Sequence, residues 1–319
     1  MKKRKIPSAS PYIRSNANTS KIMLYVLLAL LPSALAGVLN FGFSALLLLG
    51  TTTGTAIAAE IIFRTVTGKR QTVQDLSAAV TGLLIGMTLP PDIPLWKAGV
   101  GSVFAIIIVK QLFGGIGQNF ANPAATAKIF LLVLFMNDMT TWRLPQTAQT
   151  VDLTPLTGAH ASYFDMLLGN TAGCVGETCA IGLILGALFL YLTGTASPFA
   201  PIGCLGSFAV LTLAGGYDLP AQLLSGGLML GACFMTTDYT TAPLTHPGQL
   251  LFGIGVGVLT FLIRHYGGFA EGIPFAIVMM NLLTPWLDRL TKPRPFGAET
   301  EEKPVREKPK RKFLSRKAS

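Results

Sequence analysis

The chain alternates between apolar blocks about as long as a bilayer crossing and short polar connections. The apolar blocks occupy ten segments, at about 22–41, 44–63, 76–90, 97–114, 122–137, 179–194, 198–216, 220–236, 248–266 and 271–288. A straight helix needs about 20 apolar residues to cross a bilayer. The pattern therefore predicts an all-α polytopic membrane protein with about ten transmembrane helices.

Segments 76–90 and 220–236 are short for a straight crossing and are interrupted by glycine and proline. In a bilayer, a broken helix is tolerated where its free backbone groups line a cavity inside the protein. Broken helices in corresponding positions of two halves indicate a central binding site. We expect these two segments to contribute to one site.

Two sequence runs recur in the same order in both halves. Residues 82–86 (GLLIG) match residues 227–231 (GLMLG), and the run that ends at Gly114-Gly115 resembles the run that ends at Gly267-Gly268. Five helices per half is an odd number, so the pattern predicts inverted five-helix repeats at 22–137 and 179–290. The alternative is shared composition, because small residues let transmembrane helices approach closely.

The charge distribution supports a membrane protein. Only 13% of the residues are charged and the net charge is +10, whereas soluble domains carry about 25% charged residues. Of the 25 Lys and Arg, 20 lie at 1–21, 64–70 and 289–317. Basic loops stay on the cytoplasmic side, so this pattern indicates topology and not a nucleic-acid partner.

With ten helices, both basic tails, 1–21 and 291–319, face the cytoplasm, and the long polar interval 138–178 faces outward. Both tails read as unstructured segments, the first of them near anionic lipid. Residues 22–36 end in Ala34-Leu35-Ala36, which is typical of a signal-peptidase site. The apolar run continues past it, which favours a retained first helix.

A glycine-rich turn precedes the fifth segment and supplies candidate binding residues. It contains Gly114, Gly115 and Asn119, and it ends at Asn122-Pro123. Asn at the N-cap and Pro at the first helical position predict that a helix starts here. Backbone amides at such a start bind anions or polar rings. A plain turn between helices is the alternative.

Charged residues within the apolar segments are few and include Glu60, Lys110 and Lys128. Glu60 and Arg64 are four residues apart and are spaced to pair on one helix face. We expect the two lysines to extend their ammonium groups toward the membrane surface.

The four cysteines do not predict a metal site, because no histidine lies near them at ligand spacing. Cys204 and Cys233 lie in apolar segments and read as small packing residues. Cys174 and Cys179 flank the point where the polar interval returns to the membrane. They are spaced for a disulfide if that face is oxidising.

Several separated motifs resemble one membrane protein family. They are QLFGGIGQN at 111–119 followed by NPA at 122–124, GN at 169–170 with GCVGET at 173–178, LSGG at 224–227 through TD at 237–238, and GG at 267–268 with EG at 271–272. The chain resembles the D-type membrane component of the Rnf-type electron transport complex over nearly its whole length. It is more distantly similar to the B-type membrane component of the sodium-pumping NADH:quinone reductase.

The resemblance implies a membrane component with little activity alone and no catalytic residues of its own. It implies FMN bound to a threonine through a phosphoester, placed there by a separate flavin transferase. It also implies a bacterial cell-membrane complex that couples electron transfer between ferredoxin and NAD to Na⁺ or H⁺ movement, with the flavin-carrying G-type component and the C-type component as neighbours. Relatives further suggest a second, noncovalent flavin.

Thr154 is the expected FMN carrier. In the family the carrier threonine ends a Ser-Gly-Ala-Thr-like run and precedes Pro-Leu, and Thr154 is followed by Pro155-Leu156. The run before it, Val-Asp-Leu, departs from the family. Thr157 is the second candidate, because TGA at 157–159 resembles the run, although His160 then stands at the acceptor position.

Two other classes of function remain open from the sequence. Inverted repeats with broken helices also build channels and secondary transporters for small solutes. A purely structural membrane scaffold is the third interpretation.

Overall fold

The computed structural model describes residues 18–147, 149–151, 162–269 and 271–292. The described residues are mainly helical, and the only strands among them, two of two residues each, form one hairpin. The predicted all-α membrane architecture is confirmed at this level. By length and apolar composition, α1 (Thr19–Phe41), α2 (Phe43–Val66) and α12 (His246–Tyr266) are each able to cross a bilayer.

The first half of the chain is built from helices of very different lengths. After α1 and α2 come η1 (Val73–Asp75), α3 (Ser77–Met87), α4 (Leu95–Phe104), the π-helical η2 (Ala105–Gln111) and α5 (Pro123–Leu134). The predicted segment 97–114 is therefore one helix that changes its hydrogen-bonding pattern at Ala105. The predicted segment 122–137 ends earlier, at Leu134.

The second half contains the more fragmented helices. It comprises α8 (Ala180–Leu192), α9 (Phe199–Ala214), α10 (Leu219–Leu224), α11 (Leu228–Leu230), the π-helical η3 (Gly231–Met235), α12 and α13 (Ile273–Thr291). The predicted segment 220–236 is broken between α10 and α11, where Gly226 and Gly227 both adopt a φ of 67°. Only glycine adopts this conformation at little cost, so these two residues determine where the helix breaks.

The halves join through two helix pairs. Within the halves, α2 packs on α3 and α4, and α9 packs on α12; between them, α1 packs on α8 and α5 packs on α13. The α1–α8 approach depends on a glycine, since a Cβ on Gly186 would lie 2.0 Å from the carbonyl oxygen of Ala29. One buried apolar core runs through both halves and includes Leu30, Ile85, Phe234 and Phe252.

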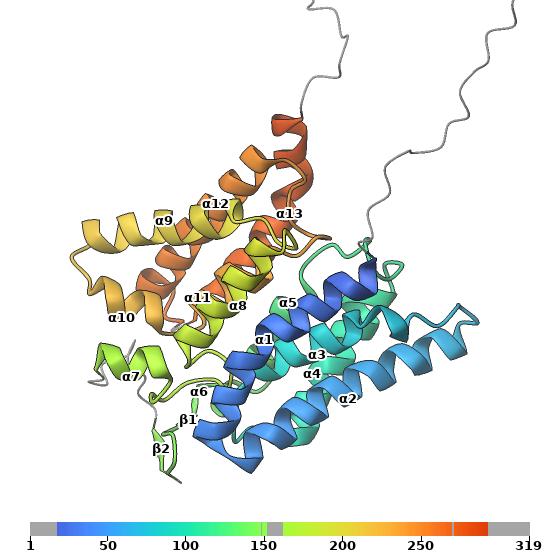
Figure 1. Cartoon of the computed structure of the whole chain (residues 1–319), viewed down its shortest axis with the longest axis horizontal. Coiled ribbons are helices and arrows are strands. Elements are labelled where there is room, and N and C mark those ends of the chain that lie inside the picture. Colours follow the sequence, from blue (N-terminus) through green and yellow to red (C-terminus); the bar gives the residue numbers. More distant parts are fainter. Residues whose placement is uncertain (1–17, 148, 152–161, 270, 293–319) are drawn as a thin grey trace, which may run out of the picture.

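The polar interval folds against one end of the bundle. It contains α6 (Met136–Thr140), β1 (Trp142–Arg143), β2 (Thr150–Val151) and α7 (Tyr163–Leu168). In Figure 1, β1, β2 and α7 lie at the lower end, whereas the start of α1 and the end of α13 lie toward the opposite end. The interval and the described chain ends are therefore on opposite faces.

Candidate functional site

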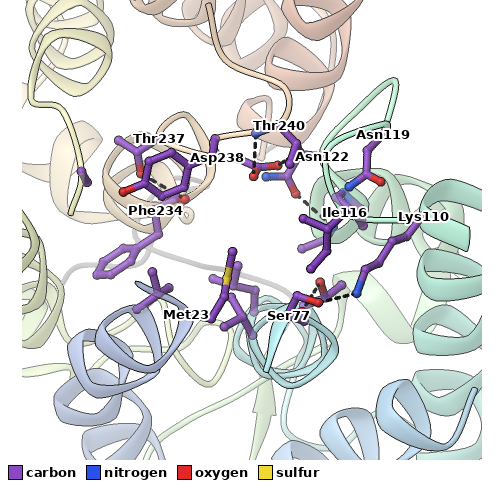
Figure 2. A pocket seen from close by; sticks show the side chains of 18 of the residues that line it. Met23, Ser77, Lys110, Ile116, Asn119, Asn122, Phe234, Thr237, Asp238 and Thr240 are labelled. Atoms are coloured by element: carbon purple, nitrogen blue, oxygen red, sulfur yellow. Dashed lines mark hydrogen bonds between the residues drawn. The ribbon is translucent and has the colours of Figure 1, made fainter. Parts of the chain in front are cut away.

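A pocket lies where the glycine-rich turn and α5 meet the end of η3 (Figure 2). Its polar lining comes from both halves of the chain and comprises Ser77, Thr81, Lys110, Asn119, Asn122, Thr195, Thr237, Asp238, Tyr239 and Thr240. Its apolar lining includes Met23, Val26, Val80, Leu84, Ile116 and Phe234. Both broken segments contribute to the lining, 220–236 only through Phe234.

Asn122 has the local role that the sequence predicts. Its Oδ1 accepts hydrogen bonds from the backbone amides of Ala124 and Ala125, at 3.0 and 3.2 Å, and Pro123 occupies the first helical position. Its Nδ2 also donates to the carbonyl oxygen of Met235 across the pocket, at 3.2 Å. Asn122 therefore caps α5 and ties it to η3 with one side chain.

The other candidates in the glycine-rich turn separate into two groups. Asn119 lines the pocket, and its Oδ1 is buried without a hydrogen-bond partner among the described residues. Gly114 and Gly115, with φ of 121° and 98°, do not line it. A Cβ at these two positions would meet Gln118 and the Arg64 guanidinium respectively, so these glycines shape the turn.

Asp238 lies on the side of the pocket opposite the glycine-rich turn. Its carboxylate accepts a hydrogen bond from the hydroxyl of Thr240 (Figure 2) and another from the hydroxyl of Thr241, each at 3.1 Å. Burial raises the pKa of Asp238 above its ordinary value, and the two threonines act in the opposite direction. In the sequence, Asp238 is singled out by its position shortly after the GLMLG run at 227–231, in the motif that ends with TD at 237–238.

Lys110 reaches a buried carboxylate beside the pocket. Its ammonium nitrogen lies 2.9 Å from Glu60 Oε2 and 2.6 Å from Ser77 Oγ. The predicted pairing of Glu60 with Arg64 is also present, at 3.6 Å. The expectation that Lys110 extends to the surface is wrong, because only 2% of its side chain is exposed.

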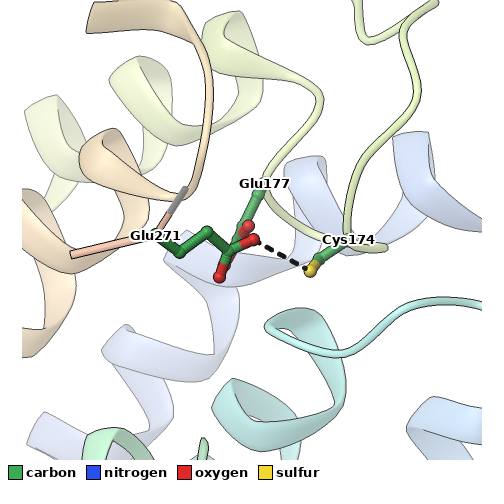
Figure 3. Close-up of side chains that lie close together, drawn as sticks. All are labelled: Cys174, Glu177 and Glu271. Carbon is green, nitrogen blue, oxygen red and sulfur yellow. Dashed lines mark hydrogen bonds between the residues drawn. The ribbon is translucent and has the colours of Figure 1, made fainter. Parts of the chain in front are cut away.

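Lys128 occupies a second buried cluster, and here too the expected extension to the surface is wrong. Its ammonium nitrogen lies 2.7 Å from Glu177 Oε1 and contacts Glu271. Cys174 donates to Glu271 Oε1 at 3.6 Å (Figure 3). Cys174, Glu177 and Glu271 converge like metal ligands, but the Lys128 ammonium already lies against both carboxylates, which disfavours a metal ion.

The cysteines are all free and buried. Cys174 and Cys179 therefore do not form the disulfide that their spacing allowed, and Cys174 belongs to the cluster around Lys128. Cys204 and Cys233 lie within α9 and η3 as packing residues.

Thr154 and Thr157 lie outside the described residues. The described ends of the interval are anchored on both sides of them. Arg143 on β1 pairs with Asp92 at 3.0 Å, and the Asn40 side chain donates to the carbonyl oxygen of Gly169 at 2.8 Å. Tyr163 donates to Asp218 at 2.9 Å, and this hydrogen bond raises the pKa of the tyrosine hydroxyl.

These features define a multi-pass α-helical membrane protein with a polar pocket between two halves. The chain belongs to the NQR2, RnfD, RnfE family, whose family model matches residues 6–297.

Several relatives match almost the whole chain, and each is named as the D component of an ion-translocating complex. The chain is 42% identical over 300 residues to that component of the Na⁺-translocating ferredoxin:NAD⁺ oxidoreductase complex of Acetobacterium woodii, covering 91% of this chain and 94% of that protein. It is 40% identical over 316 residues to the proton-translocating counterpart of Clostridium ljungdahlii, covering 91% and 95%. It is 36% identical over 340 residues to the D component of the ion-translocating oxidoreductase complex of Stutzerimonas stutzeri, covering 92% and 96%.

Proposed function

We propose that this chain is the D-type membrane component of an ion-translocating ferredoxin:NAD⁺ oxidoreductase complex and that it relays electrons through bound flavin. The observation that carries the proposal is the match, over about nine tenths of both chains, to relatives with that name. The relatives at 42% and 40% identity are named for Na⁺ and for protons. Overall similarity therefore leaves both ions as candidates here.

The pocket between the halves suits a noncovalent flavin. Asn119 presents a buried acceptor without a partner among the described residues, and leaving such a group unpaired costs about 1–3 kcal/mol. An isoalloxazine ring offers an N–H donor for it, together with carbonyl oxygens. Lys110 also lines the pocket, and its ammonium group has one proton left for such an oxygen beyond those donated to Glu60 and Ser77. A bound flavin exchanges one or two electrons, and the protein sets its position and potential.

Covalent FMN on Thr154 remains part of the proposal. Its support is the Thr-Pro-Leu sequence, together with the anchoring of β1 and Gly169 at the two described ends of the interval. A threonine hydroxyl accepts a phosphoester only where a flavin transferase reaches it, and a polar interval outside the bundle is the suitable place. Thr157 is the second candidate for the same bond.

Inverted repeats are the proposed architecture. In each half, a cation shortly before a Gly-Gly pair reaches the broken region of that half. Lys110, four residues before Gly114, donates to Ser77 at the start of α3; Arg264, three residues before Gly267, donates to the carbonyl oxygens of Ser225 and Gly226. The two arrangements support a common origin of the halves.

In this proposal the complex lies in the bacterial cell membrane, with both basic tails in the cytoplasm and the interval 138–178 outside. The distribution of Lys and Arg supports this orientation. The interval then faces the flavin-carrying G-type component. The remaining contacts are made by the C-type component and other members of the complex, by the flavin transferase during maturation, and by lipid.

Flavin content tests the proposal directly. The chain is coexpressed with a flavin transferase and separated on a denaturing gel, where covalent FMN fluoresces under ultraviolet light. We expect a fluorescent band that Thr154→Ala abolishes and Thr157→Ala preserves. The opposite result moves the bond to Thr157, and a dark wild-type band refutes covalent flavin.

The noncovalent flavin needs a separate measurement, because denaturation releases it. Acid extraction of the purified native complex should yield flavin in the supernatant, and Asn119→Leu should lower that amount severalfold while the gel fluorescence stays unchanged. Gln149→Leu, an exposed amide in the polar interval, is the matched control. Equal extraction from all three proteins would refute the pocket assignment.

A channel or secondary transporter for a small solute is the second candidate function, favoured by the broken helices around a central pocket. Liposomes that contain the isolated chain would then pass a small solute. Impermeable liposomes would exclude this alternative.

A further inference from the structure

The last part of the polar interval, residues 173–178, enters the helix bundle. The amide of Gly176 donates to the carbonyl oxygen of Met87 at 2.8 Å, and the amide of Val175 donates to Leu89 at 3.1 Å. The Ser33 hydroxyl on α1 donates to the carbonyl oxygen of Gly176 at 2.7 Å. This segment therefore completes the backbone hydrogen bonding at the broken end of α3.

The segment fits without free space. Val175 is fully buried, and a Cβ on Gly37 of α1 would lie 2.2 Å from its carbonyl oxygen. A Cβ on Gly176 would lie 2.4 Å from Met87 Cβ. We call residues 173–178 the plug segment, because protein atoms fill the space between α1 and the end of α3.

Charged side chains hold the plug segment to both halves. The Glu177 carboxylate accepts a hydrogen bond from the ammonium group of Lys128, on α5 of the first half. The same ammonium group contacts Glu271, which lies just before α13 of the second half. The carboxylate of Glu177 also lies close to Gly227, at the break between α10 and α11. Lys128 thus joins the plug segment, α5 and the second half at one point.

The elements around the plug segment, at the end of α3, correspond to those around the proposed flavin pocket, at the start of α3. The pocket lies between the start of α3, the turn after Gly114-Gly115, and the residues after η3. The plug segment lies between the end of α3, the turn after Gly267-Gly268, and Gly227 before α11. Related elements therefore enclose an open pocket on one side and a filled space on the other.

We propose that the plug segment is the outer gate of a monovalent-cation pathway between the two halves, and that Lys128 is the latch that holds it closed through Glu177 and Glu271. The proposal rests on the proposed ion-translocating function. With the latch released, both carboxylates lose their counter-charge, so a passing cation interacts favourably with them. Lys128 acts here as a positioning residue, since it sets where the plug segment lies.

Cys174 supplies a native probe, because its side chain is 0% exposed within the plug segment. The complete complex is prepared in membranes with Cys179→Ala, Cys204→Ala and Cys233→Ala in this chain, so that Cys174 is its only thiol. A membrane-impermeant maleimide is added from the outer side. We expect slow labelling at rest and labelling at least severalfold faster during NADH- or ferredoxin-driven turnover.

The latch is tested without turnover. Lys128→Met should expose Cys174 at rest, with labelling at least about tenfold faster than in wild type, and Lys128→Arg should keep it protected. Lys97→Met, which breaks the more exposed pair with Asp138, is the matched control and should leave labelling slow. Labelling that stays slow in Lys128→Met and in turning-over wild type refutes the gate.

The two proposals fail in different ways. A wild-type complex without flavin or activity, in which Lys128→Met still exposes Cys174, would count against the proposed function alone. A fully active, flavin-loaded complex whose Cys174 never becomes accessible from outside would refute the gate alone. If the Lys128→Met complex does not assemble, the rate of Cys174 labelling in the wild-type complex is compared at rest and during turnover, and equal rates refute the gate.

Discussion

The ammonium nitrogen of Lys110 lies 2.9 Å from Glu60 Oε2, and the two side chains are 2% and 0% exposed. Fifty residues separate them in the chain. Removal of one member of a buried ion pair leaves an uncompensated charge and costs about 3–5 kcal/mol, whereas replacing both members by similar uncharged groups costs much less. This pair ties η2 to α2 beside the proposed flavin pocket.

We therefore expect Lys110→Met to destabilise the protein by less than the roughly 3–5 kcal/mol of a fully uncompensated buried charge, because Arg64 still lies 3.6 Å from Glu60. Glu60→Gln/Lys110→Met should recover most of that loss. Thermal unfolding in detergent, followed by a thiol-reactive fluorescent dye, provides the measurement because all four cysteines are buried. A double variant no more stable than Lys110→Met would show that the two groups do not act as a pair.

Asn122 allows its two roles to be separated. Asn122→Ala removes the α5 cap and the hydrogen bond to Met235, each worth about 1 kcal/mol. Asn122→Asp keeps a capping acceptor but lacks the donor. Melting temperatures should fall in the order wild type, Asp, Ala; equal values for Asp and Ala would mean that the cap contributes nothing.

Gly186 tests the contact between α1 and α8. Alanine there would place its Cβ 2.0 Å from the backbone oxygen of Ala29, and such overpacking costs about 1–3 kcal/mol. Gly50→Ala on α2 is the control, because nothing lies within 4 Å of a Cβ at that position. The same dye-based melt should show a lower melting temperature for Gly186→Ala only.

Arg264 tests the break between α10 and α11. Its guanidinium donates to three carbonyl oxygens, those of Gln222, Ser225 and Gly226, at 2.8–3.1 Å. Lysine lacks the planar fork that makes these contacts together, so Arg264→Lys should cost about 1–3 kcal/mol. Arg143→Lys, at the exposed pair with Asp92, should change stability by less than about 1 kcal/mol, and a larger loss there would contradict this assignment.

The helical membrane class was predictable because it depends on local composition. Runs of apolar residues and clustered Lys and Arg report burial in lipid without any knowledge of tertiary contacts. The start of α5 at Asn122-Pro123 was predictable for a similar reason, since an N-cap involves only the next few residues. The break in segment 220–236 followed from its glycines.

The roles of the buried charges were not predictable in the same way. A lysine within an apolar segment has two outcomes, extension to the surface or burial with a carboxylate. Lys110 finds Glu60 at a separation of 50 residues, and Lys128 finds Glu177 at 49. No local sequence pattern predicts partners at such a separation, so the sequence alone favoured the wrong outcome for both lysines.

The sequence by itself determined the membrane class, the family motifs and the point where α5 begins, because each depends on neighbouring residues or on composition. Only the tertiary structure decided that the glycine-rich turn faces Asp238 across a pocket, and that residues 173–178 enter the bundle between Ser33, Met87 and Lys128. These arrangements depend on how the two halves pack through α1–α8 and α5–α13. Contacts between distant segments form only when that packing brings their buried polar groups together.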